Sequence, residues 1–342
     1  MSGALVRVDT GCRLHIGFRN LSTDRDRLFG GIGFAIDRPN HSITAQPAVG
    51  VACRHDRVRR LADEVVSLFG LSGARIEMQS DIPRHVGYGS GTQLALGTYV
   101  AIAEAHNITP TVRRHASVLG RGGRSGVGVA TFEHGGFVVD EGHPTASVLP
   151  DGSNQSGVPP IAHRDPVPQH WRIVLIRPLT RPGRSGSSEA ASIERTIEGA
   201  DAALAEDIEK CLEELVIPGL REKNIERFGR GITTIDSLNG EWFRSEQADR
   251  YRPPCDVLVR YLEDADSIYG WGQSSWGPLL YGVTTFEEVP DARALGYEAL
   301  EGEGLQGHVD IVRPRNRGAD VTELQPVSHR HQSITTDEVC QR

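Results

Sequence analysis

The sequence predicts an α+β fold in two domains, and three observations support this prediction. The chain has 342 residues, whereas single hydrophobic cores usually stop growing at roughly 250–300 residues. Segments that alternate like half-buried strands are interspersed with segments that have the apolar density of helices. Residues 142–168 are rich in Pro, Gly, Ser and Asp, as a linker is. We therefore expect an N-terminal domain over residues 1–150 and a C-terminal domain over residues 169–325.

The N-terminal domain is expected to mix strands with three helices. Strand patterns occur at residues 4–8, 41–53, 74–79 and 136–140. Helical patterns occur at residues 56–69, from about 90 to 105, and near 110–119. The third strand and the second of these helices flank a glycine-rich turn, so the helix begins at about Ser90.

The C-terminal domain is expected to open with a strand and to be mainly helical. Strand patterns lie at residues 171–177 and near 277–285 and 307–313. Helical periodicity covers about 187–215, 219–236, 240–268 and 290–301. Residues 326–342 are polar and have no apolar period, which predicts a disordered tail.

Charge and hydropathy narrow the class of partner. The net charge of -8 disfavours nonspecific nucleic-acid binding, because such binding depends on a basic face. The sequence has no apolar run long enough to span a bilayer, and its N-terminus lacks a charged-then-apolar signal pattern. We expect a cytoplasmic protein with a small-molecule partner and no membrane association.

Cysteine and lysine usage disfavour two kinds of chemistry. The five cysteines are odd in number, far apart and without a Cys-x-x-Cys pair, which indicates reduced thiols rather than disulfides or a zinc site. Lysine occurs only at Lys210 and Lys223, among 37 basic residues, so Schiff-base catalysis is disfavoured. Arginine supplies the remaining positive charge, and its planar fork matches carboxylates and phosphates.

The most informative motif is the glycine-rich segment at residues 83–93, which joins a strand to a helix. Its glycines permit positive φ and a close approach of ligand to backbone, and the first helical turn and its dipole favour phosphate or pyrophosphate. Ser90 and Thr92 add hydroxyls. The spacing matches neither the Walker pattern nor the dinucleotide fingerprint. An ordinary strand-to-helix turn with Ser90 as N-cap is the alternative.

Two further blocks of small residues indicate a shared cleft. Residues 120–140 place Arg121 and Arg124 in a glycine-rich segment before a strand, where they could clamp an anion or be solvated. Residues 270–278 form a third such loop, with Trp271 and Trp276 available to stack on a ring or to pack in the core. Three loops of this kind in one chain suggest that they line one site.

The order of these motifs resembles the superfamily of galactokinase, homoserine kinase, mevalonate kinase and phosphomevalonate kinase. More specifically, it resembles the β-ribofuranosylaminobenzene 5'-phosphate synthase family, and the resemblance spans about residues 8–313. The matching segments are residues 13–18, 30–33, 87–93, 120–136 and 272–278. The resemblance implies a GHMP-kinase-like α+β fold, with an N-terminal ribosomal-S5-like domain and a C-terminal α/β sandwich domain. It also implies a homodimer.

The family's activity is a decarboxylating pentosyl transfer in methanopterin-type biosynthesis. It joins phosphoribosyl pyrophosphate to 4-aminobenzoate or 4-hydroxybenzoate, and it releases CO2 and pyrophosphate. The donor implies Mg²⁺, which typically binds phosphate oxygens plus one or two protein carboxylates. Kinases of the superfamily carry a catalytic carboxylate in a Ser-Gly-x-Asp segment, whereas the matching residues 125–128 end in Gly128. The sequence leaves the choice between the two acceptors open.

The resemblance also implies roles for individual residues. Contacts with phosphate or pyrophosphate are expected from Gly87, Gly89, Ser90, Gly91, Thr92, Gln93, Arg121 and Arg124. Catalytic or substrate contacts are expected from Arg13, His15 and Arg27, of which Arg13 and His15 share one strand face by alternation. The substrate cleft is expected to include Gln273, Ser274 and Ser275. Conceivable Mg²⁺ ligands are Glu104, Glu133, Asp140 and Glu141, and none has a distinctive spacing.

One residue departs from the family pattern, and three functions compete. Phe29 stands where the family pattern has an acidic residue, which leaves the role of that loop open. The leading hypothesis is the pentosyltransferase. An ATP-dependent kinase for a small hydroxyl compound would need Asp140 or Glu133 to replace the carboxylate missing at Gly128. A binding protein that has lost turnover would keep the same glycine loops.

Overall fold

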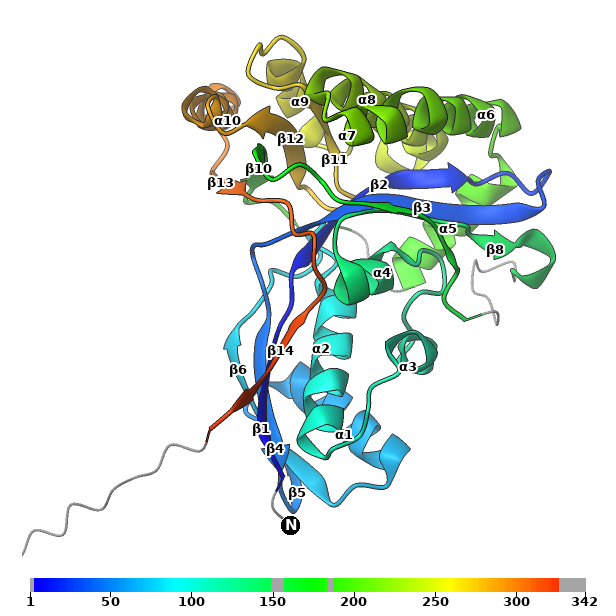
Figure 1. Cartoon of the computed structure of the whole chain (residues 1–342). Coiled ribbons are helices and arrows are strands. Elements are labelled where there is room, and N and C mark those ends of the chain that lie inside the picture. The colour runs from blue at the N-terminus through cyan, green and yellow to red at the C-terminus, as the bar shows by residue number, and fades with distance from the viewer. Residues whose placement is uncertain (1–2, 149–156, 182, 184–186, 326–342) are drawn as a thin grey trace, which may run out of the picture.

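The first of three sheets is built mostly from the start of the chain. The computed structural model describes residues 3–148, 157–181, 183 and 187–325. In spatial order the strands are β14 (Asp320–Leu324), β1 (Leu5–Asp9), β4 (Ser42–Pro47), β6 (Gly73–Ser80) and β5 (Gly50–Ala52). Helices α1 (Asp56–Phe69) and α2 (Ser90–Ala105) pack on this sheet (Figure 1). Strand β14 thus returns the end of the described chain to its beginning.

The second sheet lies across the middle of the molecule. Its strands are, in order, β2 (Cys12–Asn20), β3 (Arg27–Ile36), β7 (Phe137–Asp140) and β9 (Ile161–Asp165), with β8 (His143–Pro144) also pairing with β3. On one side lie α3 (Val112–Val118) and α4 (Val127–His134). On the other side lie α6 (Ala202–Cys211) and α8 (Ile225–Gln247) (Figure 1). The sheet is therefore sandwiched between helices of the two halves of the chain.

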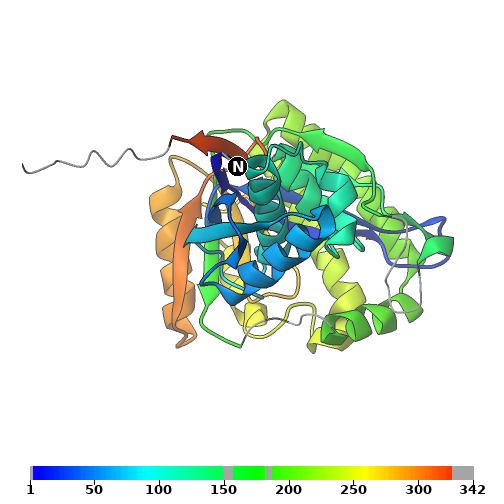
Figure 2. The ribbon, with the colours of Figure 1, turned by 90° about the horizontal axis from the view of Figure 1, so that it is seen from below.

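The third sheet belongs to the second half of the chain. Its order is β11 (Gly270–Gln273), β12 (Leu280–Thr285), β10 (Trp171–Pro178) and β13 (Gly307–Val312). Helices α9 (Cys255–Glu263) and α10 (Val289–Gly302) pack on it. The remaining helices are α5 (Ser187–Glu198), a π-helical turn over residues 212–216, and α7 (Ile217–Glu222). Seen from below, α10 and the helices of residues 187–211 lie at opposite sides of the molecule (Figure 2).

Sequence periodicity explains the helices that were predicted most accurately. Helix α1 buries Val58, Ala62 and Val65 on one face, and Gly70 ends it in the left-handed conformation. Helix α2 is apolar nearly all round because the first sheet, α1 and α4 enclose it. The predicted bounds 56–69 and 90–105 are confirmed. The predicted α+β class is confirmed as well.

Other predicted elements differ from the structure. The predicted helix over residues 240–268 is the end of α8, a turn and the separate helix α9. Helix α8 ends where Ala248 adopts a left-handed φ of 76°, and Pro253 and Pro254 precede the start of α9. The block at residues 120–136 contains α4, and the block at residues 270–278 begins with β11. The predicted strand 41–53 is two strands, β4 and β5. The predicted disordered tail, residues 326–342, lies outside the described residues.

Two absences hold within the described ranges. None of the helices there is long and apolar enough to cross a membrane. The four cysteines described, Cys12, Cys53, Cys211 and Cys255, are buried free thiols. This agrees with the prediction of reduced cysteines, while Cys340 lies outside the described residues.

Candidate active site

The glycine-rich segment forms an open helix start. Helix α2 begins at Ser90, as predicted, and its N-cap is Gly89 with a left-handed φ of 68°. No side chain caps the helix, so the alternative with Ser90 as N-cap is wrong. The N–H of Thr92 donates to the carbonyl of Gly89 at 3.2 Å. The positive end of the helix dipole is therefore directed at the loop, as an anion site requires.

The glycine loop is locked against the loop after β11. Ser274 Oγ donates to the carbonyl oxygen of Gly87 at 2.8 Å and accepts the N–H of His15 at 3.0 Å. Gly87 has a φ of 119°, and a Cβ there would lie 2.7 Å from the carbonyl oxygen of Ser274. A single buried hydroxyl thus joins the glycine loop to strand β2. Two of the three predicted loops therefore meet.

Two arginines flank the start of α2. Arg13 on β2 donates from Nη1 to the carbonyl of Gly87 at 3.4 Å, and Arg121 Nη1 would lie 3.3 Å from a Cβ at Gly91. Burial lowers the pKa of Arg13 to about 10 and also lowers that of Arg121. The Nε atoms of both are buried without a hydrogen-bond partner. Unpaired guanidinium donors beside an open helix start fit a phosphate or pyrophosphate group.

A carboxylate that the sequence analysis missed lies beside these arginines. Glu189 on α5 has Oε1 3.9 Å from Nη1 of Arg124. Burial raises the pKa of Glu189, and the charges of Arg124 and Arg13 oppose this rise. The sequence signal that could have found Glu189 is the Gly- and Ser-rich run at residues 183–188 immediately before it. Arg124 therefore belongs to the group around Arg13.

Gly128, which stands where kinases of the superfamily have a catalytic carboxylate, faces the glycine loop and has no side chain. A Cβ at Gly128 would lie 3.3 Å from Cγ2 of Thr92. The two carboxylates considered as replacements are engaged elsewhere. Glu133 pairs with Arg113 at 3.3 Å, and Asp140 is buried among backbone N–H groups. Neither one takes the place left by Gly128.

Asp140 organises the loop that carries the second glycine block. Its carboxylate accepts the N–H of Gly126 at 2.7 Å and that of Gly142 at 2.9 Å. Burial raises its pKa to about 6, and these hydrogen bonds oppose the rise. Asp140 is therefore a positioning residue for residues 125–128.

Replacing Asp140 by alanine is expected to destabilise the protein. The change leaves two buried N–H groups without acceptors, and it should lower the free energy of unfolding by about 2–4 kcal/mol. Asp140→Asn keeps one carbonyl acceptor and should lose less. Urea unfolding monitored by tryptophan fluorescence measures both variants. Equal stability of Asp140→Ala and the unmodified protein would contradict the assigned role.

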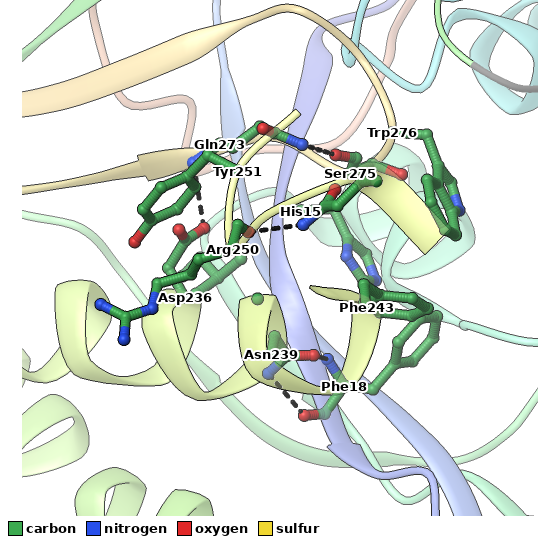
Figure 3. Close-up of a pocket in the computed structure, with 13 residues that line it drawn as sticks. His15, Phe18, Asp236, Asn239, Phe243, Arg250, Tyr251, Gln273, Ser275 and Trp276 are labelled. Carbon is green, nitrogen blue, oxygen red and sulfur yellow. Dashed lines mark hydrogen bonds between the residues drawn. The ribbon is translucent and has the colours of Figure 1, made fainter. Parts of the chain in front are cut away.

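A pocket lined in part by His15 lies between β2, α8 and the loop after β11 (Figure 3). The pocket is partly open to solvent. Burial lowers the pKa of His15 well below its ordinary value, so its ring is neutral at pH 7. Gln273 and Ser275, which are expected in the substrate cleft, line this pocket, whereas Ser274 Oγ is hydrogen-bonded to the glycine loop. The remaining lining residues are Ile16, Phe18, Asp236, Asn239, Gly240, Phe243, Gln247, Arg250, Tyr251 and Trp276.

Three residues that the family pattern singles out make contacts away from a ligand position in the structure. Arg27 donates to the carbonyl oxygens of Glu141 and Gly142 at 2.7 and 2.8 Å, so the structure does not bring it to the glycine loop. Gln93 is buried and donates to the carbonyl of Gly128 at 2.9 Å, which ties α2 to α4. Phe29 is buried with its ring 5.6 Å from that of Phe18, so an acidic role is absent here.

The conceivable metal ligands are dispersed. Glu104 lies near the C-terminal end of α2, away from the glycine loop, and Glu141 pairs with Arg27 at 3.2 Å. Within the described residues, no three His, Cys, Asp or Glu side chains gather as a metal site.

Comparison with known proteins assigns the family. The β-ribofuranosylphenol 5'-phosphate synthase of Archaeoglobus fulgidus is 30% identical over 327 residues, covering 93% of this chain and 99% of that protein. The enzyme of the same name from Methanothermobacter thermautotrophicus is 30% identical over 332 residues, covering 91% and 97%. The chain belongs to the β-ribofuranosylphenol 5'-phosphate synthase family.

The wider superfamily follows from two further comparisons. The family model for the GHMP kinases N terminal domain matches residues 56–136. Mevalonate kinase from Methanococcus jannaschii superposes with a TM-score of 0.61 at 12% identity, covering 91% of this chain and 98% of that one. Homoserine kinase from Cytophaga hutchinsonii gives 0.55 at 16% identity, covering 92% and 97%. The GHMP-kinase-like fold of this family member is thereby confirmed.

Proposed function

We propose that the protein is a decarboxylating pentosyltransferase that joins phosphoribosyl pyrophosphate to a 4-substituted benzoate and releases CO2 and pyrophosphate. The observation that carries the proposal is its relationship, over almost the whole chain, to synthases from two other organisms. The name of those synthases contains phenol, and a phenol product arises from 4-hydroxybenzoate. We therefore favour 4-hydroxybenzoate over 4-aminobenzoate as the acceptor.

The donor is assigned to the start of α2. The pyrophosphate lies at the first-turn N–H groups, with Ser90 and Thr92 beside it and the guanidinium groups of Arg13 and Arg121 on its flanks. These donors stabilise the negative charge that develops as the pyrophosphate leaves. Because they are already fixed by burial and by neighbouring backbone, little reorganisation is needed during the reaction.

Magnesium is part of this proposal. Mg²⁺ would neutralise the pyrophosphate and assist its departure when bound. Glu189 is the protein carboxylate best suited to hold it, because its ion pair with Arg124, at 3.9 Å, is longer than those of Glu133 and Glu141, at 3.3 and 3.2 Å. Asp140 is a poorer candidate, since its carboxylate accepts backbone N–H groups.

The missing carboxylate at Gly128 suits this chemistry. A kinase must remove a proton from an attacking alcohol, whereas the acceptor here attacks through a ring carbon made electron-rich by its para group. Loss of the carboxylate as CO2 restores aromaticity. A donor site beside Gly128 therefore needs no proton-accepting side chain next to Thr92. The kinase alternative has no such replacement in Asp140 or Glu133, which are both engaged elsewhere.

The direct test is release of labelled CO2 from carboxyl-labelled 4-hydroxybenzoate and 4-aminobenzoate, each with phosphoribosyl pyrophosphate and Mg²⁺. We expect CO2 and pyrophosphate in equal amounts, with the higher rate for 4-hydroxybenzoate. A parallel assay with ATP and small alcohols tests the kinase. If the folded protein binds the donor but releases neither product, the proposal fails. Homodimerisation and a cytoplasmic location stay predictions.

A further inference from the structure

The pocket beside His15 combines aromatic walls with a buried carboxyl group. Phe243 packs edge-on against Trp276, with ring centroids 4.8 Å apart, and Phe18 packs edge-on against His15 at 4.9 Å. Asp236 on α8 lies among these residues and is only 4% exposed (Figure 3). The aromatic walls alternate with polar side chains, among them Asn239 and Arg250 as well as Asp236. Such a mixed lining suits a small aromatic ring that carries polar substituents.

Only one of the two carboxylate oxygens of Asp236 has a hydrogen-bond partner. Its Oδ1 accepts the N–H of Gln273 at 3.0 Å, which fixes the carboxyl group beside β11. Its Oδ2 is buried without a partner, and so is the hydroxyl of Tyr251. The Tyr251 hydroxyl lies close enough to influence the pKa of Asp236, yet the two form no hydrogen bond of normal geometry. Leaving such groups unsatisfied costs about 1–3 kcal/mol each, so they point to a ligand.

The pocket adjoins the donor site through one short chain of hydrogen bonds. His15 lines the pocket, and its N–H donates to Ser274 Oγ, which donates to the carbonyl of Gly87 in the glycine loop. The placement that we consider puts one end of a ring at Asp236 and its opposite end toward Ser274, the residue that contacts the glycine loop. This is the orientation that transfer to a para-substituted ring carbon requires.

We propose that this pocket binds the aromatic acid acceptor, with its para hydroxyl on Asp236 Oδ2 and Tyr251 and its carboxylate-bearing carbon toward Ser274. The assignment rests on the proposed pentosyl transfer and makes Asp236 a catalytic residue. Burial raises the pKa of Asp236 well above its ordinary value, so its carboxylate is a stronger base than that of an exposed aspartate. In its ionised form the side chain can accept a proton and return it.

The proton balance follows from this placement. A bond forms between the carboxylate-bearing ring carbon and C1 of the ribose, while the bond from C1 to pyrophosphate breaks and its electron pair leaves with pyrophosphate. The para O–H gives its proton to Asp236, so the ring becomes a neutral dienone. The bond to the carboxylate then breaks, CO2 departs, and the electron pair restores the aromatic ring. Asp236 returns the proton to the phenol oxygen.

The test compares Asp236→Asn and Tyr251→Phe with the matched control Asp207→Asn, which removes an exposed carboxylate on α6. Calorimetric titration with 4-hydroxybenzoate and with benzoate measures binding without turnover. We expect the unmodified protein to prefer 4-hydroxybenzoate. Asp236→Asn should weaken its binding about tenfold and leave benzoate binding unchanged, and Tyr251→Phe should weaken it about threefold. Turnover should fall about 10²–10⁴-fold in Asp236→Asn.

The outcomes separate this inference from the proposed function. If the unmodified protein releases CO2 and Asp236→Asn matches it in kcat and in binding, the reaction stands and the pocket assignment is overturned. If the unmodified protein releases no CO2, the proposed reaction fails, and the binding preference for the para hydroxyl still decides the pocket. Equal binding of 4-hydroxybenzoate and benzoate by the unmodified protein overturns the assignment. If Asp236→Asn does not fold, the same measurements on Tyr251→Phe decide the assignment.

Discussion

Replacing Arg13 by methionine is expected to lower kcat/KM for phosphoribosyl pyrophosphate by a factor of about 10²–10³ without lowering the stability of the fold. The loss follows from the position of Arg13 at the start of α2, where its Nη1 lies 3.4 Å from the carbonyl of Gly87. A preorganised donor that meets charge developing in the transition state has an effect of this size. Its effect should exceed that of any exposed arginine.

The free energy of unfolding of Arg13→Met should stay the same or rise, although its kcat/KM falls. Arg13 is half-buried, its Nε atom has no hydrogen-bond partner, and desolvation lowers its pKa to about 10. Removing such a group from water costs free energy that its weak contacts recover only in part, so an apolar side chain of similar length is tolerated or stabilising. Glu189 keeps the neighbouring charge of Arg124, 3.9 Å away. Keeping the Arg13 guanidinium available for a ligand thus lowers the free energy of unfolding of the protein.

Steady-state kinetics with the donor varied, together with urea unfolding, measures both effects. Arg317→Met is the matched control, since the Arg317 side chain is 70% exposed and pairs with Asp320. We expect it to leave kcat/KM within about twofold and stability within about 0.5 kcal/mol. An Arg13→Met protein with normal donor kinetics would remove Arg13 from the donor site. A protein that simply unfolds would show instead that Arg13 is structural.

The parts of the fold that sequence predicts well are those determined locally. Helix α1 has one apolar face and a glycine that ends it, and both features are visible in its own residues. The start of α2 is likewise marked by its glycines. By contrast, β14 pairs with β1 in a register that sets Leu324 against Leu5. No local pattern specifies a partner so distant along the chain.

The same difference between local motifs and long-range contacts explains which candidate site residues the sequence could predict. The glycine loop carries its chemistry in a short motif, so the sequence predicts an anion site there. Asp236 and Glu189 are single carboxylates within helical patterns, where an exposed charge is the usual expectation. Only the packing of α8 on β11 buries Asp236 beside Gln273, and only tertiary structure brings Glu189 near Arg124. Asp236 is distinguished in the folded protein by a buried carboxylate oxygen that lacks a partner.

Replacing Gly87 by alanine is expected to abolish measurable synthase activity and to lower the free energy of unfolding by about 2–4 kcal/mol. Gly87 has a φ of 119°, which L-residues rarely adopt, and an added Cβ would lie 2.7 Å from the carbonyl oxygen of Ser274. That neighbour is backbone, so no side-chain rotation relieves the contact. The two loops must separate, which breaks the hydrogen bond from Ser274 Oγ to Gly87.

The control Gly70→Ala separates backbone strain from loss of this contact. Gly70 also has a positive φ, 61°, but no atom lies within 4 Å of the position of its added Cβ. Its replacement should therefore cost about 1 kcal/mol from backbone strain and leave CO2 release near normal. The larger loss in Gly87→Ala then measures the contact between the glycine loop and the loop after β11. If both variants lose the same stability and keep activity, that contact does not hold the donor site in place.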